Sequence, residues 1–172
     1  MKTYKLLVIP ILLIGCATIT TGPSQTSESF QGKISRLLIV FNSTPLGNEA
    51  SRIKDEEFDK LILPFRQVNL EAESFFYNDL DIDADTNLET KSQNYEYTLL
   101  IQPIQLMRGD ATRNTYNLHL IENRSQRKIW VSQIREPGAG LLGIELYRRF
   151  EEMGQKIVEN MSADGLISAE GM

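Results

Sequence analysis

Apolar residues recur at two different spacings along this chain, and the two spacings predict strands and helices in turn. The continuous apolar run of residues 37–41 is followed by turn-forming residues 42–48, a pattern typical of a strand covered on both faces. Apolar residues three or four apart then predict an amphipathic helix from about Ala50. This helix should end or kink around Leu63, because Pro64 loses a backbone hydrogen bond and clashes with the preceding turn. The residues that set the spacing are Phe58, Leu61, Ile62 and Phe65.

Further strands follow this first unit. Residues 71–77 predict a second strand, parallel to the first through the helical crossover. Residues 95–106 predict a third, with an edge position or a bend near Pro103. Residues 116–121 and 128–134 flank a polar turn, so they predict an antiparallel hairpin.

A last apolar stripe predicts a C-terminal helix of about five turns. Residues 137–140, Pro-Gly-Ala-Gly, mark the start of this helix, and Asp164 and Gly165 mark its end. The order of elements therefore predicts an α/β (α+β) fold: a two-layer sandwich in which two main helices cover one face of a mixed sheet of about five strands. The stripe consists of Leu142, Leu146, Phe150, Met153, Ile157 and Met161.

The N-terminus has the pattern of a secretory signal. Lys2 and Lys5 form a basic region, and the apolar run of residues 6–14 is far shorter than the roughly 20 residues of a spanning helix. Residues 13–16, Leu-Ile-Gly-Cys, resemble the lipobox of bacterial lipoprotein precursors. The resemblance implies a signal peptide over residues 1–15, cleavage between Gly15 and Cys16, and diacylglycerol and fatty-acyl chains such as palmitate on Cys16.

The residue after Cys16 bears on the membrane that would hold the lipid. Lipoproteins of this class are typically retained in the inner membrane by an aspartate at that position, and Ala17 stands there instead. The resemblance therefore implies an outer-membrane anchor with the domain facing the periplasm. In a cell without an outer membrane, the anchor would lie in the cell membrane.

Residues 17–32 are rich in Ser, Thr, Gly and Gln. Such a composition does not offset the entropy of ordering a chain, so it predicts a flexible tether between Cys16 and the folded part. The folded part is expected over residues 33–167 as a single domain, followed by a tail at 168–172. A lipid joined to a tether would raise the concentration of the domain near a partner.

Composition excludes several classes of function. Without the signal, 16 Lys and Arg remain against 23 Asp and Glu, a net charge of about −7 that offers no footprint for nucleic acid. Cys16 is the only cysteine, and no free thiol remains if its sulfur carries a lipid, so a disulfide, a thiolate metal site and a cysteine nucleophile within one chain are then excluded. His119 is the only histidine, which excludes multi-histidine zinc sites. No cofactor is expected.

One acidic segment has the start of a calcium-loop pattern. Asp79, Asp81 and Asp83 alternate as the first ligands of such a loop do. The sixth position is Ala84 rather than glycine, and the twelfth is Thr90 rather than glutamate. A solvated acidic loop is therefore the preferred interpretation, and no metal is expected, although these three aspartates are the best metal candidates in the chain.

Candidate contact residues lie in the predicted hairpin. Arg124 and Arg127 stand at its tip, and Trp130 follows. Exposed tryptophan is enriched at binding hot spots, and the alternative is that Trp130 packs under the C-terminal helix. The order of elements and the motif of residues 121–130 resemble small envelope lipoproteins similar to the penicillin-binding-protein activator and curli-secretion lipoprotein domains. This resemblance implies a fold and carries over no functional residue.

These features predict a membrane-anchored envelope lipoprotein that is not an enzyme. It would dock on another envelope protein as an accessory or assembly factor. The alternative is a periplasmic ligand-binding or hydrolytic module that uses the acidic loop. A deep pocket with converging acids would favour the alternative, and a flat surface with an exposed apolar patch would favour docking.

Overall fold

A computed structural model describes residues 18–53, 55–105, 113–137 and 149–168 of the chain. Its centre is a seven-stranded sheet in the order β1-β7-β6-β5-β3-β4, with β2 paired to β7 beside β1. β3 pairs parallel with β4 and β5, and the remaining pairs are antiparallel, so the sheet is mixed as predicted. The strands are β1 (Thr20–Thr21), β2 (Gln25–Thr26), β3 (Arg36–Asn42), β4 (Glu71–Tyr77), β5 (Tyr97–Gln105), β6 (Arg113–Glu122) and β7 (Arg127–Pro137).

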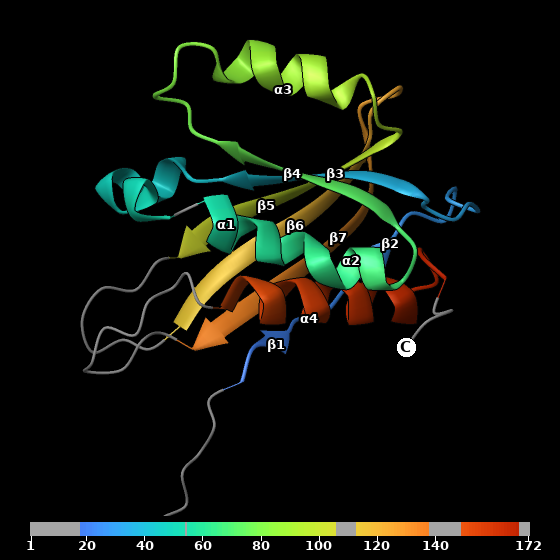
Figure 1. Cartoon of the computed structure of the whole chain (residues 1–172). Helices are drawn as coiled ribbons and strands as arrows, with labels where there is room; N and C mark the ends of the chain where they lie inside the picture. The colour runs from blue at the N-terminus through green and yellow to red at the C-terminus, as the bar shows by residue number, and fades with distance from the viewer. Residues whose placement is uncertain (1–17, 54, 106–112, 138–148, 169–172) are drawn as a thin grey trace, which may run out of the picture.

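Helices form a layer on one face of this sheet, as Figure 1 shows, and a nine-residue helix, α3, lies across the other face near β4. The predicted two-layer α/β architecture is therefore confirmed, with a sheet larger than the expected five strands. The helical elements are η1 (Thr44–Arg52), α1 (Asp55–Phe58), η2 (Asp59–Ile62), α2 (Leu63–Gln67), α3 (Ala84–Ser92) and α4 (Phe150–Ala163).

β3 is covered on both faces, as its continuous apolar run predicts. Leu37, Ile39 and Phe41 belong to the main core, while Leu38 and Val40 between them are at most 1% exposed. The third predicted strand corresponds to β5, which is an interior strand. Its pairing with β6 shifts register at Pro103, where a bend is expected. A proline in an interior strand is thus accommodated by an irregularity in the ladder.

The crossover from β3 to β4 is helical but broken into short pieces rather than one helix. The chain passes from the 3-10 geometry of η2 into α2 at Leu63, and Pro64 occupies the first turn of α2. Proline is tolerated there because the first turn needs no N–H donor for an intrahelical bond. The apolar side chains that predicted the helix are all buried: Phe58, Leu61, Ile62 and Phe65.

The C-terminal stripe is buried wherever the structure describes it. α4 begins at Phe150, and Leu142 and Leu146 lie outside the described residues. Gly154 faces η2, where a Cβ atom would overlap the carbonyl oxygen of Leu61. The glycine therefore sets how closely α4 approaches the crossover. The buried stripe residues are Phe150, Met153, Ile157 and Met161.

The segment expected to be a flexible tether is docked on the sheet over its described part. Thr20 and Thr21 pair with Arg135 and Ile134 of β7, and β2 continues the same course further along. Ile19, the first apolar residue of the segment, is 2% exposed. β7 would otherwise present an edge with unpaired backbone groups, and the segment satisfies them. Its polar composition is no obstacle, since main-chain hydrogen bonds and the buried side chain of Ile19 hold it.

The sheet has two distinct ends. At the carboxyl end, β3, β4, β5 and β7 finish, and β1 begins beside the last residues of β7. At the hairpin end, β3, β4 and β5 start, beside the β6–β7 turn. None of the helices in the described residues combines the length and apolarity needed to cross a membrane.

Candidate functional site

Trp130, a candidate contact residue, is a core residue. Its side chain is 1% exposed, and Nε1–H donates a 2.6 Å hydrogen bond to Oδ2 of Asp164, just after α4. The alternative in which Trp130 packs under the C-terminal helix is therefore the one found. Ile129 is buried too, because it is the extra residue of a bulge between the pairs Leu120–Trp130 and Ile121–Lys128. A bulge turns two consecutive side chains away from strict alternation, and sequence periodicity does not reveal it.

The acidic segment does not form a calcium loop. Asp79, Asp81 and Asp83 are exposed, and the chain turns into helix α3 at Ala84 before the loop pattern is complete. Among residues 18–53, 55–105, 113–137 and 149–168, no group of three acidic, histidine or cysteine side chains could hold a metal ion. Acidic residues are favoured before and within the first turn of a helix, so the run of aspartates also reads as a helix start.

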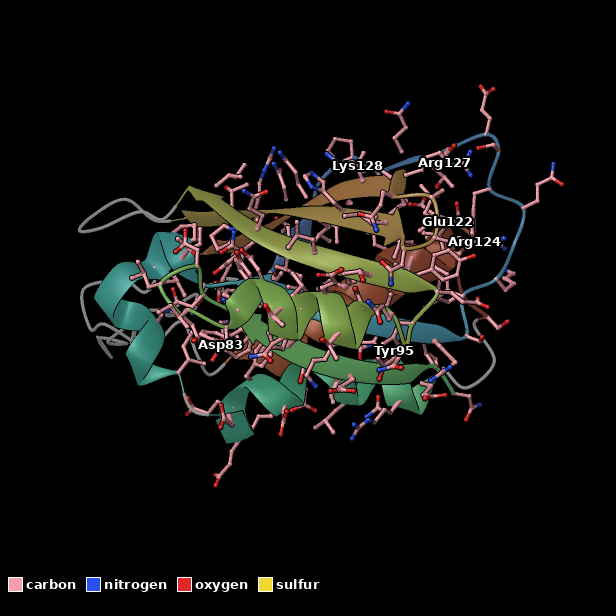
Figure 2. The ribbon with its side chains drawn as sticks, turned by 90° about the horizontal axis from the view of Figure 1, so that it is seen from above. Asp83, Tyr95, Glu122, Arg124, Arg127 and Lys128 are labelled. Carbon is pink, nitrogen blue, oxygen red and sulfur yellow. The ribbon has the colours of Figure 1, made fainter. Side chains whose placement is uncertain are left out.

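Arg124 and Arg127 lie together at the hairpin end. Figure 2 shows them beside Glu122, Lys128 and Tyr95, with Asp83 at the opposite end of the molecule. Arg124 and Lys128 are exposed and form no ion pair within the described part of the chain. A guanidinium nitrogen of Arg127 lies 3.7 Å from a carboxylate oxygen of Glu122. The tip of the hairpin is therefore cationic, although the protein as a whole is acidic.

Hydrogen bonds fix this tip to the neighbouring connection between α3 and β5. The side-chain amide of Asn123 donates to the carbonyl oxygens of Ser92 and Tyr95 at 3.0 and 2.8 Å, and its backbone N–H donates to the carbonyl of Glu96 at 2.9 Å. Gln126 adopts a φ of 57°, and its amide donates to the carbonyl of Asn123 at 2.7 Å. The cations are thus presented on a preorganised turn.

Tyr95 joins the hairpin end to the start of β3 and β4. Its hydroxyl donates a 2.8 Å hydrogen bond to Glu73, which also accepts one from Lys91 of α3. The guanidinium of Arg36 lies 5.4 Å from the centre of the Tyr95 ring and forms a 3.0 Å ion pair with Glu71. The distance to the ring is within the range of a cation–π interaction. Side chains from β3 and β4, far from Tyr95 in sequence, therefore both contact this one aromatic side chain.

The protonation states of this cluster are set by its contacts. Hydrogen bonds from Lys91 and then from Tyr95 lower the pKa of the Glu73 carboxyl. Burial, followed by the hydrogen bond to Glu73, raises the pKa of Tyr95 to about 12. At neutral pH Glu73 is therefore ionised and Tyr95 protonated. The pair is a stable hydrogen bond rather than an acid–base couple tuned to the working pH.

Two shallow grooves adjoin Tyr95. One, of about 650 Å³, runs between Arg36 and the hairpin and is lined by Tyr97, Glu122 and Arg124 among others. The other, of about 700 Å³, lies along the start of β4 beside Glu71 and Glu73. We call the two grooves together with the hairpin tip the hairpin-end surface. Its residues are Arg36, Arg66, Asn69, Leu70, Glu71, Ala72, Glu73, Ser92, Gln93, Asn94, Tyr95, Glu96, Tyr97, Glu122, Asn123, Arg124, Arg127 and Lys128.

Sequence reasoning located only part of this surface. Arg124 and Arg127 are visible in sequence as a turn between two strands. Arg36, Glu73 and Tyr95 are not, because they meet only through the pairing of β4 and β5 with β3. The lining is mostly polar. The surface therefore matches neither of the two features named above as favouring one function, the deep pocket with converging acids or the exposed apolar patch.

His119 lies on the face of the sheet away from α4, in register with Leu100 and Val131. It is half-buried and lines a separate groove of about 610 Å³ with Asn117 and Gln133. Burial, and then the charge of Lys128, lower its pKa, so the imidazole is neutral at pH 7.

No family model matches the chain, and no curated protein matches it. Among solved structures, the chain is similar to the PelC dodecamer from Paraburkholderia phytofirmans, with a TM-score of 0.45, 13% identity, and coverage of 84% of this chain and 96% of that one. It is also similar to lipoprotein GNA1162 from Neisseria meningitidis, with a TM-score of 0.43, 14% identity, and coverage of 77% and 99%. Likeness at this level does not identify a function.

Proposed function

We propose that this chain is a membrane-anchored bacterial envelope lipoprotein without enzymatic activity, which docks on another envelope protein through its hairpin-end surface. The resemblance of residues 13–16 to a lipobox supports the anchor on Cys16. Ala17 favours the outer membrane, with the domain in the periplasm. The docking role is that of an accessory or assembly factor.

The cationic hairpin tip is the observation that carries the docking role. Arg124 projects from a turn that Asn123 ties to the α3–β5 connection, and Lys128 lies at the start of β7 directly after this turn. Because the turn is already ordered, little conformational entropy is lost when a partner binds. Exposed cations select a partner surface of opposite charge and repel other cationic surfaces. The partner is therefore expected to present an acidic patch to the hairpin.

A non-enzymatic role is supported by the state of the titratable groups. At neutral pH Tyr95 is protonated and Glu73 is ionised, so this pair is not poised to transfer a proton. The alternative function, a ligand-binding or hydrolytic module on the acidic loop, requires carboxylates that converge. Asp79, Asp81 and Asp83 are instead exposed along a turn that leads into α3.

The anchor is tested with Cys16→Ser in cells labelled with a palmitate analogue. The native chain is expected to incorporate the label and to sediment with membranes, whereas the variant loses the label and keeps its signal peptide. Incorporation of the label into the variant would exclude Cys16 as the acylation site. Membrane association of a native chain that carries no label would exclude a lipid anchor.

The docking surface is tested by photo-crosslinking in cells. A photoreactive amino acid replaces Gln126, which is exposed at the tip. A discrete crosslinked partner is expected, and the double variant Arg124→Glu, Arg127→Glu should abolish it. Lys60→Glu is the matched control, since Lys60 is an exposed cation of the helical layer. The proposed surface is wrong if the double variant crosslinks as strongly as the control.

A further inference from the structure

We propose that the carboxyl end of the sheet rests directly on the membrane, so that the lipid bilayer is a contact surface of the folded domain as well as the site of its anchor. This inference depends on acylation of Cys16, proposed above. It differs from the expectation of a free tether, in which the domain would tumble at a distance from the membrane.

The short connection to Cys16 is the first reason. Ile19 is buried, and its backbone N–H donates a 3.1 Å hydrogen bond to Oε1 of Glu152 in α4. The same Glu152 is held by Arg149 through two nitrogens, at 2.8 and 2.9 Å. Residue 19 is therefore a fixed point of the fold. Only Ala17 and Thr18 lie between it and Cys16, so the three Cα–Cα steps from Cys16 to Ile19 span at most about 11 Å.

The direction of β1 is the second reason. β1 begins beside Arg135, near the last residues of β7, so the chain enters the fold at the carboxyl end. β7 has 11 residues, and an extended strand of that length measures about 35 Å. A lipid held within about 11 Å of one end of such a strand brings that end to the membrane and leaves the other end far from it.

Exposed apolar side chains gather at the same end. The described residues contain four exposed large hydrophobic side chains, and three of them are at the carboxyl end. Leu80 and Ile82, 81% and 97% exposed, lie in the turn after β4, and Ile104, 50% exposed, lies near the end of β5. The fourth, Leu63, belongs to the helical layer. Side chains of this kind gain free energy from contact with the acyl boundary of a bilayer.

The aspartates of the acidic loop determine how deep this contact is. Asp79, Asp81 and Asp83 alternate with Leu80 and Ile82, and all three side chains are exposed to water. Charged carboxylates remain among the headgroups. The loop therefore lies at the interface and does not insert into the bilayer.

This orientation places the hairpin-end surface away from the membrane. Arg124 and Lys128 then stand about 35 Å from the headgroups, the length of β7. At physiological ionic strength that distance is several Debye lengths, so anionic lipids do not compete for these cations. The tip is left free for a protein partner.

The orientation is tested with lipidated protein bound to vesicles of phosphatidylethanolamine with some phosphatidylglycerol. An environment-sensitive dye is attached to Ile82→Cys or, as the matched control, to Lys128→Cys, both exposed positions. Cys16 is the only native cysteine, and its thiol is blocked once acylated. Nitroxide-labelled lipid should quench the dye at residue 82 several-fold more than the dye at residue 128.

A third variant separates orientation from mere attachment. An insertion of about 20 Gly and Ser residues between Ala17 and Thr18 adds a flexible reach of roughly 25 Å. It should reduce quenching at residue 82 to near that at residue 128, because the apolar contacts then act at a much lower effective concentration. Equal quenching at the two positions of the uninserted protein, while it floats with the vesicles, would overturn the orientation alone. Failure of the protein to float with vesicles would overturn the lipid anchor, and the orientation with it.

Discussion

Gly154→Ala is expected to destabilise the protein, although alanine is the better helix former. Gly154 lies in the first half of α4, where that helix crosses η2. An added Cβ would overlap the carbonyl oxygen of Leu61 and come within 3.2 Å of the Leu61 carbonyl carbon and of Cγ of Pro64. Two of these three atoms are backbone, so the overlap can be relieved only if α4 and the crossover move apart.

The expected size follows from two opposing effects. Inserting a methyl group into a packed contact costs about 1–3 kcal/mol, and a contact against backbone is at the upper end of that range. Replacing glycine by alanine within a helix stabilises the helix by about 1 kcal/mol. The net loss is therefore about 2 kcal/mol, which lowers the midpoint of thermal unfolding by about 4–8 °C for a chain of this size.

Trp130 provides the assay. It is the only tryptophan and is 1% exposed, so its fluorescence reports loss of the core between the sheet and α4. The matched control is Gly165→Ala, where φ is +74° and nothing lies within 4 Å of the added Cβ. That variant measures backbone strain of about 1 kcal/mol without overlap. An increase in stability for Gly154→Ala would refute the close approach of α4 to η2.

Three further predictions concern buried polar groups and the N-terminal segment. Burial raises the pKa of Glu136 more than hydrogen bonds from Tyr116 and Asn114 lower it. The folded state therefore binds the Glu136 proton more tightly than the unfolded state. Its contribution to the free energy of unfolding is fully present below the unfolded pKa and is lost as pH rises through the folded pKa. Glu136→Gln should therefore melt higher than the native protein at pH 7 and equally at pH 4, and an unchanged midpoint at pH 7 would contradict this. Asp164→Ala leaves the buried Trp130 indole N–H without its partner and should cost about 1–3 kcal/mol in urea unfolding, whereas Asp164→Asn, which keeps an acceptor, should cost less. Ile19→Asp places a charge at a site that is 2% exposed and should make residues 18–32 sensitive to limited proteolysis, while Thr20→Asp, at an exposed site, should leave them protected.

Side-chain periodicity accounts for most of the elements that were predicted correctly. The continuous run at 37–41 became β3, and the stripe from Phe150 to Met161 became the buried face of α4. Pro64 marked the position where the crossover changes geometry. In each case the residues themselves carry the signal, because burial of an apolar side chain depends mainly on which face of its own element it occupies.

Helix α3 was not predicted, and for Trp130 the sequence left exposure and burial under the C-terminal helix as two alternatives, for different reasons. The aspartates before α3 signal a loop and a helix start equally, and α3 has few apolar residues to decide between them. Trp130 is buried together with Ile129 because of a bulge opposite β6, which depends on the register of two strands. A pattern with strict alternation places these two neighbours on opposite faces.

The sequence by itself determined the α/β class, the order of the main elements and the residues of the core, since these follow from local periodicity and composition. Only the tertiary structure decided that residues 18–27 run along the edge of β7, and that Arg36, Glu73 and Tyr95 meet beside the hairpin. Main-chain hydrogen bonds to a strand edge need no particular side chains, so a polar segment can dock without any trace in its composition. Contacts between distant segments depend on strand register, which is set by the whole sheet and not by any one stretch of the chain.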